Sequence, residues 1–521
     1  MAVALAENRI PARHETANKW LVAVAVMLAT TMEWIDGTIA MVALLHIRGS
    51  LSAGVDEAAW VLTSYIVANA VIIPLTGWCG AYFGRKRFFI FSILLFVFGS
   101  LMAGVSPNLQ MLVFCRVLQG LGGGAMMPMS QAILMETFPP EEQAVAMSVW
   151  GLGAMLAPVG GPILGGWIID NYSWRWIFYI NVPVGLIAIL MMVVFVHDPA
   201  YVRRDIKTID WWGLWLLVAG ITCLQVMLDK GERLDWFDSR FIWTLTAVSS
   251  TGLMLFVIRE LHTSEPIVDL RVLHNRNFAL GTIFTTVVMF GMYGTYMLIP
   301  LFCQQISGYT PMLAGLVLSI QSLGTLFSML FAGRLFNKMD PRLMVAIGCL
   351  AGGIGSWDMT HFYAQIDFWS IAMPGLLRGA AAGFIFLPLT TLSLGAVNME
   401  DMGTASGLFN MVRTIGGSVG IAILVATLTS AAQVHQTYLA GHLDLFRLNL
   451  LQHAYPASSA QFTLHGGSPA LQMMYMELQR QASVMAFVDD FRIIAYIFFI
   501  LTPVALFMHK PAARSSAPAS H

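Results

Sequence analysis

Charged residues are scarce in this chain of 521 residues: Asp, Glu, Lys and Arg make up only 11% of it, against about 25% in soluble domains. The formal net charge of −1 argues against a nucleic-acid partner, which would require a basic surface. Cysteines number five and are scattered singly, so neither a disulfide framework nor a zinc site is indicated. The phosphate-loop and H-E-x-x-H motifs are missing as well, and with them the usual signs of an enzyme, a cofactor or a metal.

Hydrophobic residues are abundant instead, at 57% of the chain. They form fourteen long apolar segments, and a helix needs about 20 apolar residues to cross a bilayer. Because lipid cannot satisfy backbone hydrogen bonds, each segment is expected to be helical, which predicts an all-α membrane protein with 14 transmembrane helices. The predicted spans are 20–44, 58–80, 88–106, 109–133, 143–168, 177–196, 209–229, 240–260, 279–303, 311–336, 342–363, 369–394, 404–430 and 490–509.

Lys and Arg residues predict the orientation of these spans, since cytoplasmic loops carry an excess of them. Of the 28 cations, 17 lie in loops or at span ends on one side, 8 on the other side, and three in the interiors of spans. Both termini belong to the richer side. We therefore expect both termini to be cytoplasmic.

The chain also repeats itself with an offset near 260 residues. The segment RVLQGLGGGAMMPMSQ from Arg116 is similar to RGAAAGFIFLPLTT from Arg378, and GWCGAYFGRKR from Gly77 to GRLFNKMDPR from Gly333. Duplicated six-helix halves are typical of transporters, which bind substrate at the midplane between them. Chance similarity of glycine-rich helices is the alternative reading.

Two acids, Glu33 and Asp36, lie in the middle of the first span. Their spacing of three places them on one helix face. An acid at membrane depth costs roughly 2.5–3.5 kcal/mol, and two neighbouring carboxylates resist ionising together. The pair is therefore expected to take up and release protons, although hydrogen-bonded acids that only fix helix packing remain an alternative.

Arginines inside other spans are the natural counter-charges. Arg116, in the fourth span, is expected to pair with the acids and complete a proton switch, unless it only bonds backbone carbonyls. Three further polar residues, Gln119, Arg378 and Arg413, are candidates for lining an inner cavity.

Glycine and proline mark two further segments. The fifth span reads WGLGAMLAPVGGPILGGW, and small residues permit close helix contact while prolines bend a helix. A hinge or seal there would use Gly153, Pro158, Gly161, Pro162, Gly165 and Gly166, and plain packing would demand the same residues. The connection after the second span carries a glycine and cation motif at Gly77, Gly84, Arg85 and Lys86.

These motifs resemble the major facilitator superfamily, and more narrowly its fourteen-span drug:proton antiporters, over nearly the whole chain. The segment IDGTIAMVAL from Ile35 looks like the family's acidic motif, RVLQG from Arg116 like its arginine motif, and GGPILGG from Gly160 like its antiporter motif. The resemblance implies proton-coupling roles for Asp36 and Arg116. The chain departs from the pattern at Ala81, where the loop motif normally has an acid, and at Glu33, which is an added acid.

The resemblance implies an organisation and a function. Two six-helix bundles would be joined through two inserted helices. The expected divisions of the chain are a cytoplasmic segment at 1–19, a first bundle at 20–196, an inserted pair at 197–260, a cytoplasmic connection at 261–278, a second bundle at 279–509 with a periplasmic loop at 431–489, and a cytoplasmic tail at 510–521. The expected function is proton-coupled efflux of amphipathic drugs from the bilayer or cytoplasm, feeding a periplasmic membrane-fusion adaptor and an outer-membrane channel. The alternatives are a transporter of a defined metabolite, such as a siderophore or fatty acid, and, more remotely, a membrane enzyme or receptor.

Overall fold

The computed structural model describes residues 19–53, 55–196, 210–263, 266–336, 338–398, 401–441 and 469–507, and within them the chain is entirely helical. The first half comprises α1 (Lys19–Ser50), α2 (Val55–Phe83), α3 (Arg85–Gly104), α4 (Leu109–Thr137), α5 (Pro140–Asn171), α6 (Trp176–Tyr179) and α7 (Asn181–Phe195). Next come α8 (Trp211–Lys230) and α9 (Arg240–His262). The second half comprises α10 (Arg276–Gln305), α11 (Pro311–Leu335), α12 (Pro341–Asp358), α13 (Phe368–Gly395), α14 (Met402–Gly441) and α16 (Pro469–Leu506).

Every predicted span coincides with one of these helices, the sixth span with α6 and α7 together. In the described part of the chain, 11 helical segments are long and apolar enough to cross a membrane. The helices α4, α5 and α16 do not meet that standard. A multi-pass membrane protein is therefore confirmed, and the count of fourteen stays a prediction.

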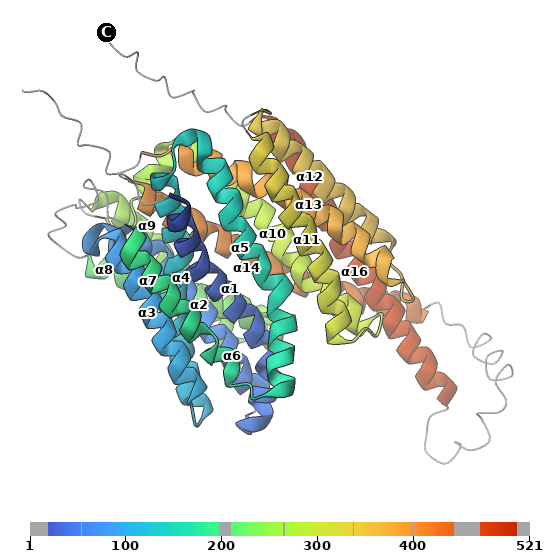
Figure 1. Ribbon diagram of the computed structural model, residues 1–521. Helices are drawn as coiled ribbons and strands as arrows, with labels where there is room; N and C mark the ends of the chain where they lie inside the picture. Colours follow the sequence, from blue (N-terminus) through green and yellow to red (C-terminus); the bar gives the residue numbers. More distant parts are fainter. Residues whose placement is uncertain are drawn as a thin grey trace, which may run out of the picture.

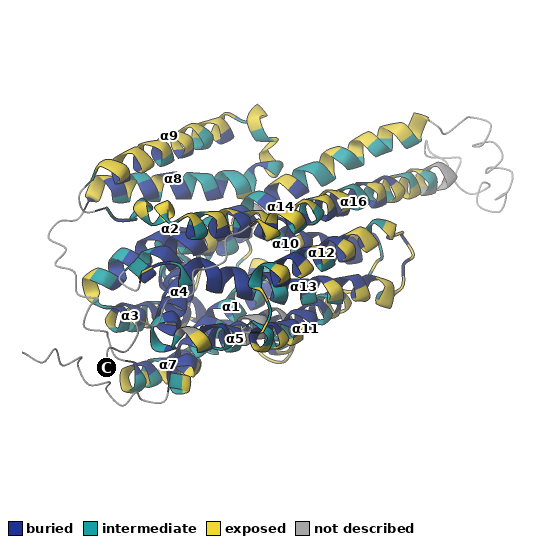
Figure 2. Cartoon of the chain, turned by 90° about the horizontal axis from the view of Figure 1, so that it is seen from above, coloured by how far each residue is buried: buried dark blue, intermediate teal, exposed yellow. Residues whose placement is uncertain are grey.

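The helices fall into two groups that lie side by side, with α1 to α7 in one and α10 to α16 in the other (Figure 1). The groups meet where α2 packs on α14 and α5 packs on α11. The inserted helices α8 and α9 pack on each other, and α8 also contacts α2 and α14 at the edge of the bundle (Figure 2). The site described below lies inside the first group.

Close contacts join the two halves at one end of the bundle, where α2 ends, α5 begins, α11 ends and α14 begins; we call it the joined end. Gly77 lies so close to Thr404 that a Cβ atom on Gly77 would overlap the Thr404 backbone. On the other side of the interface, a Cβ atom on Gly333 would overlap the side chain of Ser148. Glycine is needed at Gly77 because a larger residue would force α2 and α14 apart.

Toward the opposite end, α5 is less covered. A Cβ atom on Gly160 or Gly166 would meet nothing within 4 Å. The side chains of Ile163 and Trp167 are 56% and 55% exposed, respectively. The two halves are thus held together at the joined end, and one face of α5 is exposed beyond its middle.

Matched contacts agree with the expected internal repeat and give its register. Gly99 on α3 lies against Gln119, with 2.9 Å between an ideal Cβ and Gln119 Cγ, and Gly355 on α12 lies against Arg378, with 2.8 Å to Arg378 Cγ. Arg378 therefore occupies the place of Gln119, 259 residues earlier, an offset that agrees with the expected value near 260. Sequence similarity of glycine-rich helices is compatible with several registers, whereas contacts select one.

The long connection expected at 431–489 is shorter than predicted. Helix α14 continues to Gly441, and α16 begins at Pro469, so both helices extend well past the predicted spans. Figure 2 shows α14 and α16 projecting beyond the other helices. The expected segments 1–18, 197–209 and 508–521 lie outside the described residues.

Polar caps set several helix starts, because the first backbone N–H groups of a helix lack internal partners. Asn108 accepts from Met111 N at the start of α4, and Asn275 accepts from Asn277 N at the start of α10. Asp367 begins α13, and hydrogen bonds from Ser370 lower the pKa of Asp367 below its usual value. These caps fix the ends of helices whose apolar middles pack in the bundle.

Candidate functional site

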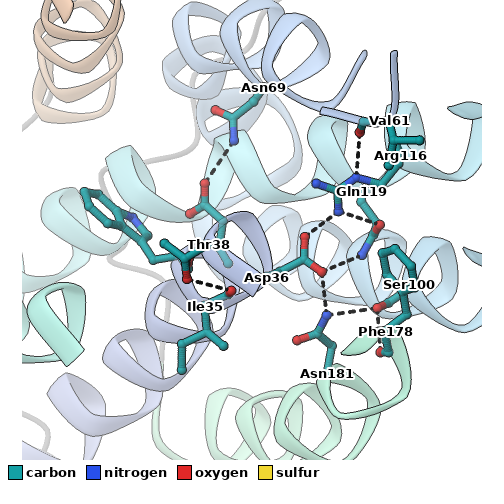
Figure 3. A network of polar contacts seen from close by, with 12 residues as sticks. Ile35, Asp36, Thr38, Val61, Asn69, Ser100, Arg116, Gln119, Phe178 and Asn181 are labelled. Carbon is teal, nitrogen blue, oxygen red and sulfur yellow. Dashed lines mark hydrogen bonds and ion pairs between the residues drawn. The ribbon is translucent and has the colours of Figure 1, made fainter. Parts of the chain in front are cut away.

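The predicted ion pair between the first and fourth spans is present. Arg116 Nη1 on α4 lies 2.5 Å from Asp36 Oδ2 on α1, and Arg116 and Asp36 are 0% and 2% exposed (Figure 3). Arg116 Nε also donates to the Val61 carbonyl (3.1 Å), and the guanidinium lies 4.1 Å from the centre of the Tyr65 ring. Both charges are therefore removed from water, and the pair is held by α1, α2 and α4 together.

Two amides complete the environment of Asp36. Asn181 Nδ2 at the start of α7 donates to Asp36 Oδ1 at 2.8 Å and to Ser100 Oγ at 3.0 Å. Gln119 Nε2 donates to Asp36 Oδ1 at 3.3 Å, and Gln119 Oε1 accepts from Arg116 Nη1 at 3.0 Å. Gln119, expected to line a cavity, is fully buried in this network instead.

Asn181 and Ser100 escaped the sequence reasoning. Each stands as a single polar residue in an apolar segment, and nothing local connects Asn181 with an acid 145 residues away. The sequence offered one signal, an amide residue inside an apolar segment. Polar groups inside a membrane are expected to find partners.

Proton uptake at Asp36 requires a change in the hydrogen bonds of this network. All three side chains that reach its carboxylate do so as donors, as suits an ionised acid. A guanidinium has no acceptor, so a proton on Oδ2 displaces Arg116. A proton on Oδ1 requires the Asn181 or Gln119 amide to turn over and present its oxygen. Protonation of Asp36 therefore alters the contacts that hold α1, α4 and α7 together.

Glu33 belongs to a different set of contacts. Its Oε1 accepts from Asn69 Nδ2 on α2 at 3.0 Å, and its buried Oε2 has no partner. Although Glu33 and Asp36 are one helical turn apart, their carboxylates turn to different neighbours. Arg413, from the other half, is close enough for its charge to act on Glu33. Glu33 thus faces the interface between the halves, whereas Asp36 is enclosed within one half.

The second half has no equivalent acid–arginine pair among its described residues. Arg378 Nη1 donates to Ser356 Oγ (2.8 Å), and its Nη2 donates to the Gly291 carbonyl (3.3 Å). Arg378 is buried, and its guanidinium lies 5.7 Å from the centre of the Phe498 ring. Neutral acceptors therefore hold this arginine inside the second half, away from the interface.

The glycine motif of the fifth span packs α5 against α1. A Cβ atom on Gly153, Gly161 or Gly165 would meet the side chains of Thr31, Thr38 and Ile39, respectively, whereas Gly166 has open space around it. The helix continues through Pro158 and Pro162. These contacts join helices within the first half, and the hinge role of the motif stays a prediction.

The loop motif between α2 and α3 forms a tight turn. Gly84 has φ 86°, a left-handed conformation that favours glycine. Arg85 pairs with Glu136 at the end of α4, and Lys86 Nζ donates to the Val193 carbonyl at 2.7 Å. Ala81 removes the usual acid of this motif, but Arg85 still has a carboxylate partner. On the long outer connection, His435 contacts Asp489 at 2.7 Å.

A bundle of apolar helices in two repeated halves, with a buried acid–arginine pair in one of them, defines a multi-pass membrane transporter. The model of the Major Facilitator Superfamily matches residues 25–421, and the chain belongs to this family.

Several characterised proteins are similar to the chain over most of its length. The multidrug export protein EmrB of Haemophilus influenzae is 38% identical, over 85% of this chain and 87% of that protein. The probable multidrug resistance protein EmrY of Escherichia coli is 36% identical (94% and 96%), and the fatty acid resistance protein FarB of Neisseria gonorrhoeae is 35% identical (95% and 96%). The crystal structure of the human organic anion transporter MFSD10 matches with a TM-score of 0.60 over 92% of this chain and 99% of that chain, and at 12% identity it supports the fold alone.

Proposed function

We propose that this protein exports amphipathic toxic organic compounds across a bacterial inner membrane in exchange for protons. The buried Asp36–Arg116 pair carries the proposal, because it links a titratable acid to the packing of three helices. The names of the relatives, which include a multidrug export protein and a probable multidrug resistance protein, support the substrate class.

The proposed topology has fourteen spans with both termini in the cytoplasm. Its support comes from the excess of Lys and Arg on one side and from the packing of α4, α5 and α16 among the apolar helices. On this topology the joined end faces the cytoplasm. The described conformation is then closed to the cytoplasm, with α5 accessible from the periplasmic side.

The cycle follows from the network. In the outward-facing state a proton enters at Asp36 and loosens Arg116 and the two amides. The halves then part at the joined end, substrate binds from the cytoplasm or inner leaflet, and Asp36 releases its proton to the cytoplasm. Each elementary charge that crosses is driven by about 2.3 kcal/mol per 100 mV, enough for roughly a 50-fold gradient. One proton exchanged for one monovalent cation moves no net charge and uses only the pH difference.

A periplasmic adaptor and an outer-membrane channel are the proposed partners. The support is the projection of α14 and α16 beyond the bundle, on the side opposite the joined end. Exposed apolar side chains, including Val434 and Met476, lie on these projecting segments. They supply a surface that a helical partner would cover.

The test of coupling is Asp36→Asn in proteoliposomes. Asparagine keeps the size of the side chain but cannot exchange a proton, so substrate-driven proton release should fall to the level of empty liposomes. Gln225→Asn, which shortens a buried amide on α8 outside the network, is the matched control. Undiminished proton release by the Asp36→Asn protein would rule out the proposed role of Asp36.

A second candidate is export of a defined metabolite, such as a fatty acid, and the name of one relative favours it. An efflux assay over a panel of dyes, uncouplers, antibiotics and fatty acids separates the two. Transport of one chemical series only would support the second candidate.

A further inference from the structure

Arg413 on α14 is a buried cation with poor compensation. It is 4% exposed, its Nη2 contacts only the Met127 sulfur on α4, and its Nε has no partner. A thioether is a weak acceptor. Among the described residues no carboxylate forms an ion pair with Arg413, although Glu33 is near enough for their charges to interact. Buried guanidinium groups are normally paired with an anion, because an uncompensated buried charge is costly.

The neighbouring polar residues are also incompletely bonded. Asn410, one helical turn before Arg413, donates to Gln131 Oε1 on α4 at 2.6 Å. The Oδ1 atom of Asn410 and the Nε2 atom of Gln131 are buried and without partners. Because Asn410 and Arg413 are three residues apart, they lie on one face of α14 and point toward the first half. This face of α14 therefore carries hydrogen-bond donors and acceptors that have no partner in the present contacts.

Both contacts cross from one half to the other on the side of the joined end. When the halves part there, Met127 and Gln131 move away with α4. Arg413 then loses only a weak contact, and Asn410 loses one hydrogen bond. A guanidinium and an amide face the opened space, beside the Phe386 ring, whose centre lies 5.4 Å from the guanidinium. The space opens toward the compartment from which the exporter loads.

We propose that Arg413 and Asn410 form an anion-binding subsite for the carboxylate or sulfonate group of an amphipathic substrate. A guanidinium presents paired N–H donors that match the two oxygens of such a group. The inference rests on the proposed export function and adds that amphipathic anions are among the exported substrates. The nearby Glu33 carboxylate opposes anion binding only when it is ionised.

The experiment compares two fluorescent substrates in proteoliposomes that contain the full chain. One is a dansyl-labelled alkyl sulfonate, which stays anionic at every accessible pH, and the other is the cation ethidium. The quantity measured is the ratio of their initial proton-driven transport rates. Arg413→Gln should lower the sulfonate-to-ethidium ratio by about tenfold or more, as expected for loss of a charge-assisted bond. Arg413→Lys should lower it less, and Asn410→Leu, which removes the amide of the subsite, should lower it as well.

The matched control is Arg378→Gln, which removes a buried arginine that neutral acceptors already satisfy; its ratio should stay within about twofold of the native value. A native protein that moves ethidium but no sulfonate overturns the subsite, as does an Arg413→Gln protein that loses both substrates equally. If Arg413→Gln does not reconstitute, an unchanged sulfonate-to-ethidium ratio in Asn410→Leu overturns the subsite. Failure of the native protein to move either substrate refutes the export function itself.

Discussion

The Asp36–Arg116 pair should show strong energetic coupling, which a double-mutant cycle can measure. The variants are Asp36→Asn, Arg116→Gln and the double variant. At 2.5 Å and with almost no exposure, the two charges attract each other by about 7 kcal/mol at an effective dielectric constant near 20. Desolvation offsets part of this attraction, but removing one partner leaves the other charge buried and costs about 3–5 kcal/mol.

Removing both charges together should therefore cost much less than the two single losses combined. We expect a coupling of about 2–4 kcal/mol, measured from the thermal unfolding of the four purified proteins in one detergent. The Asp210–Arg259 pair is the control, because its arginine side chain is 41% exposed and the expected coupling is below about 1 kcal/mol. Additive effects at Asp36 and Arg116 would refute the interpretation of the site as a tight ion pair.

Three further outcomes follow from particular contacts. Replacing Asn181 with Leu removes the donor 2.8 Å from Asp36 Oδ1, so proton-coupled transport should fall about tenfold; Asn171→Leu, at the exposed end of α5, should leave the rate unchanged in the same assay. Gly77→Ala should part α2 from α14. In a cysteine-free background, a cysteine placed at position 410 should then react faster with maleimide. Gly49→Ala is the control, because its added Cβ meets nothing within 4 Å, and it should not change that rate. Val434→Asp and Met476→Asp, on the projecting helices, should abolish drug resistance in cells but preserve transport in proteoliposomes, and loss of both would contradict an adaptor surface.

The positions of the helices were readable from the chain alone, because hydropathy is a local property. Each apolar run coincides with a helix, and only the ends differ, most clearly where α14 and α16 continue past the lipid-length segments into Gly441 and Pro469. The pairing of Asp36 with Arg116 was also predictable. Each is an expensive charge inside an apolar run, and two opposite charges of that kind are expected to meet.

The remaining features depend on which helices lie against each other, and hydropathy does not encode that. Asn181 reaches Asp36 only because α7 packs beside α1, and glycine contacts give Arg378 the place in the second half that Gln119 has in the first. Arg413 looked like any other intramembrane cation until α14 was seen against α4, with a sulfur atom as its neighbour instead of an acid. Apolar runs indicate where the chain enters the membrane, but the partners of its few polar groups are chosen by packing between segments far apart in the chain.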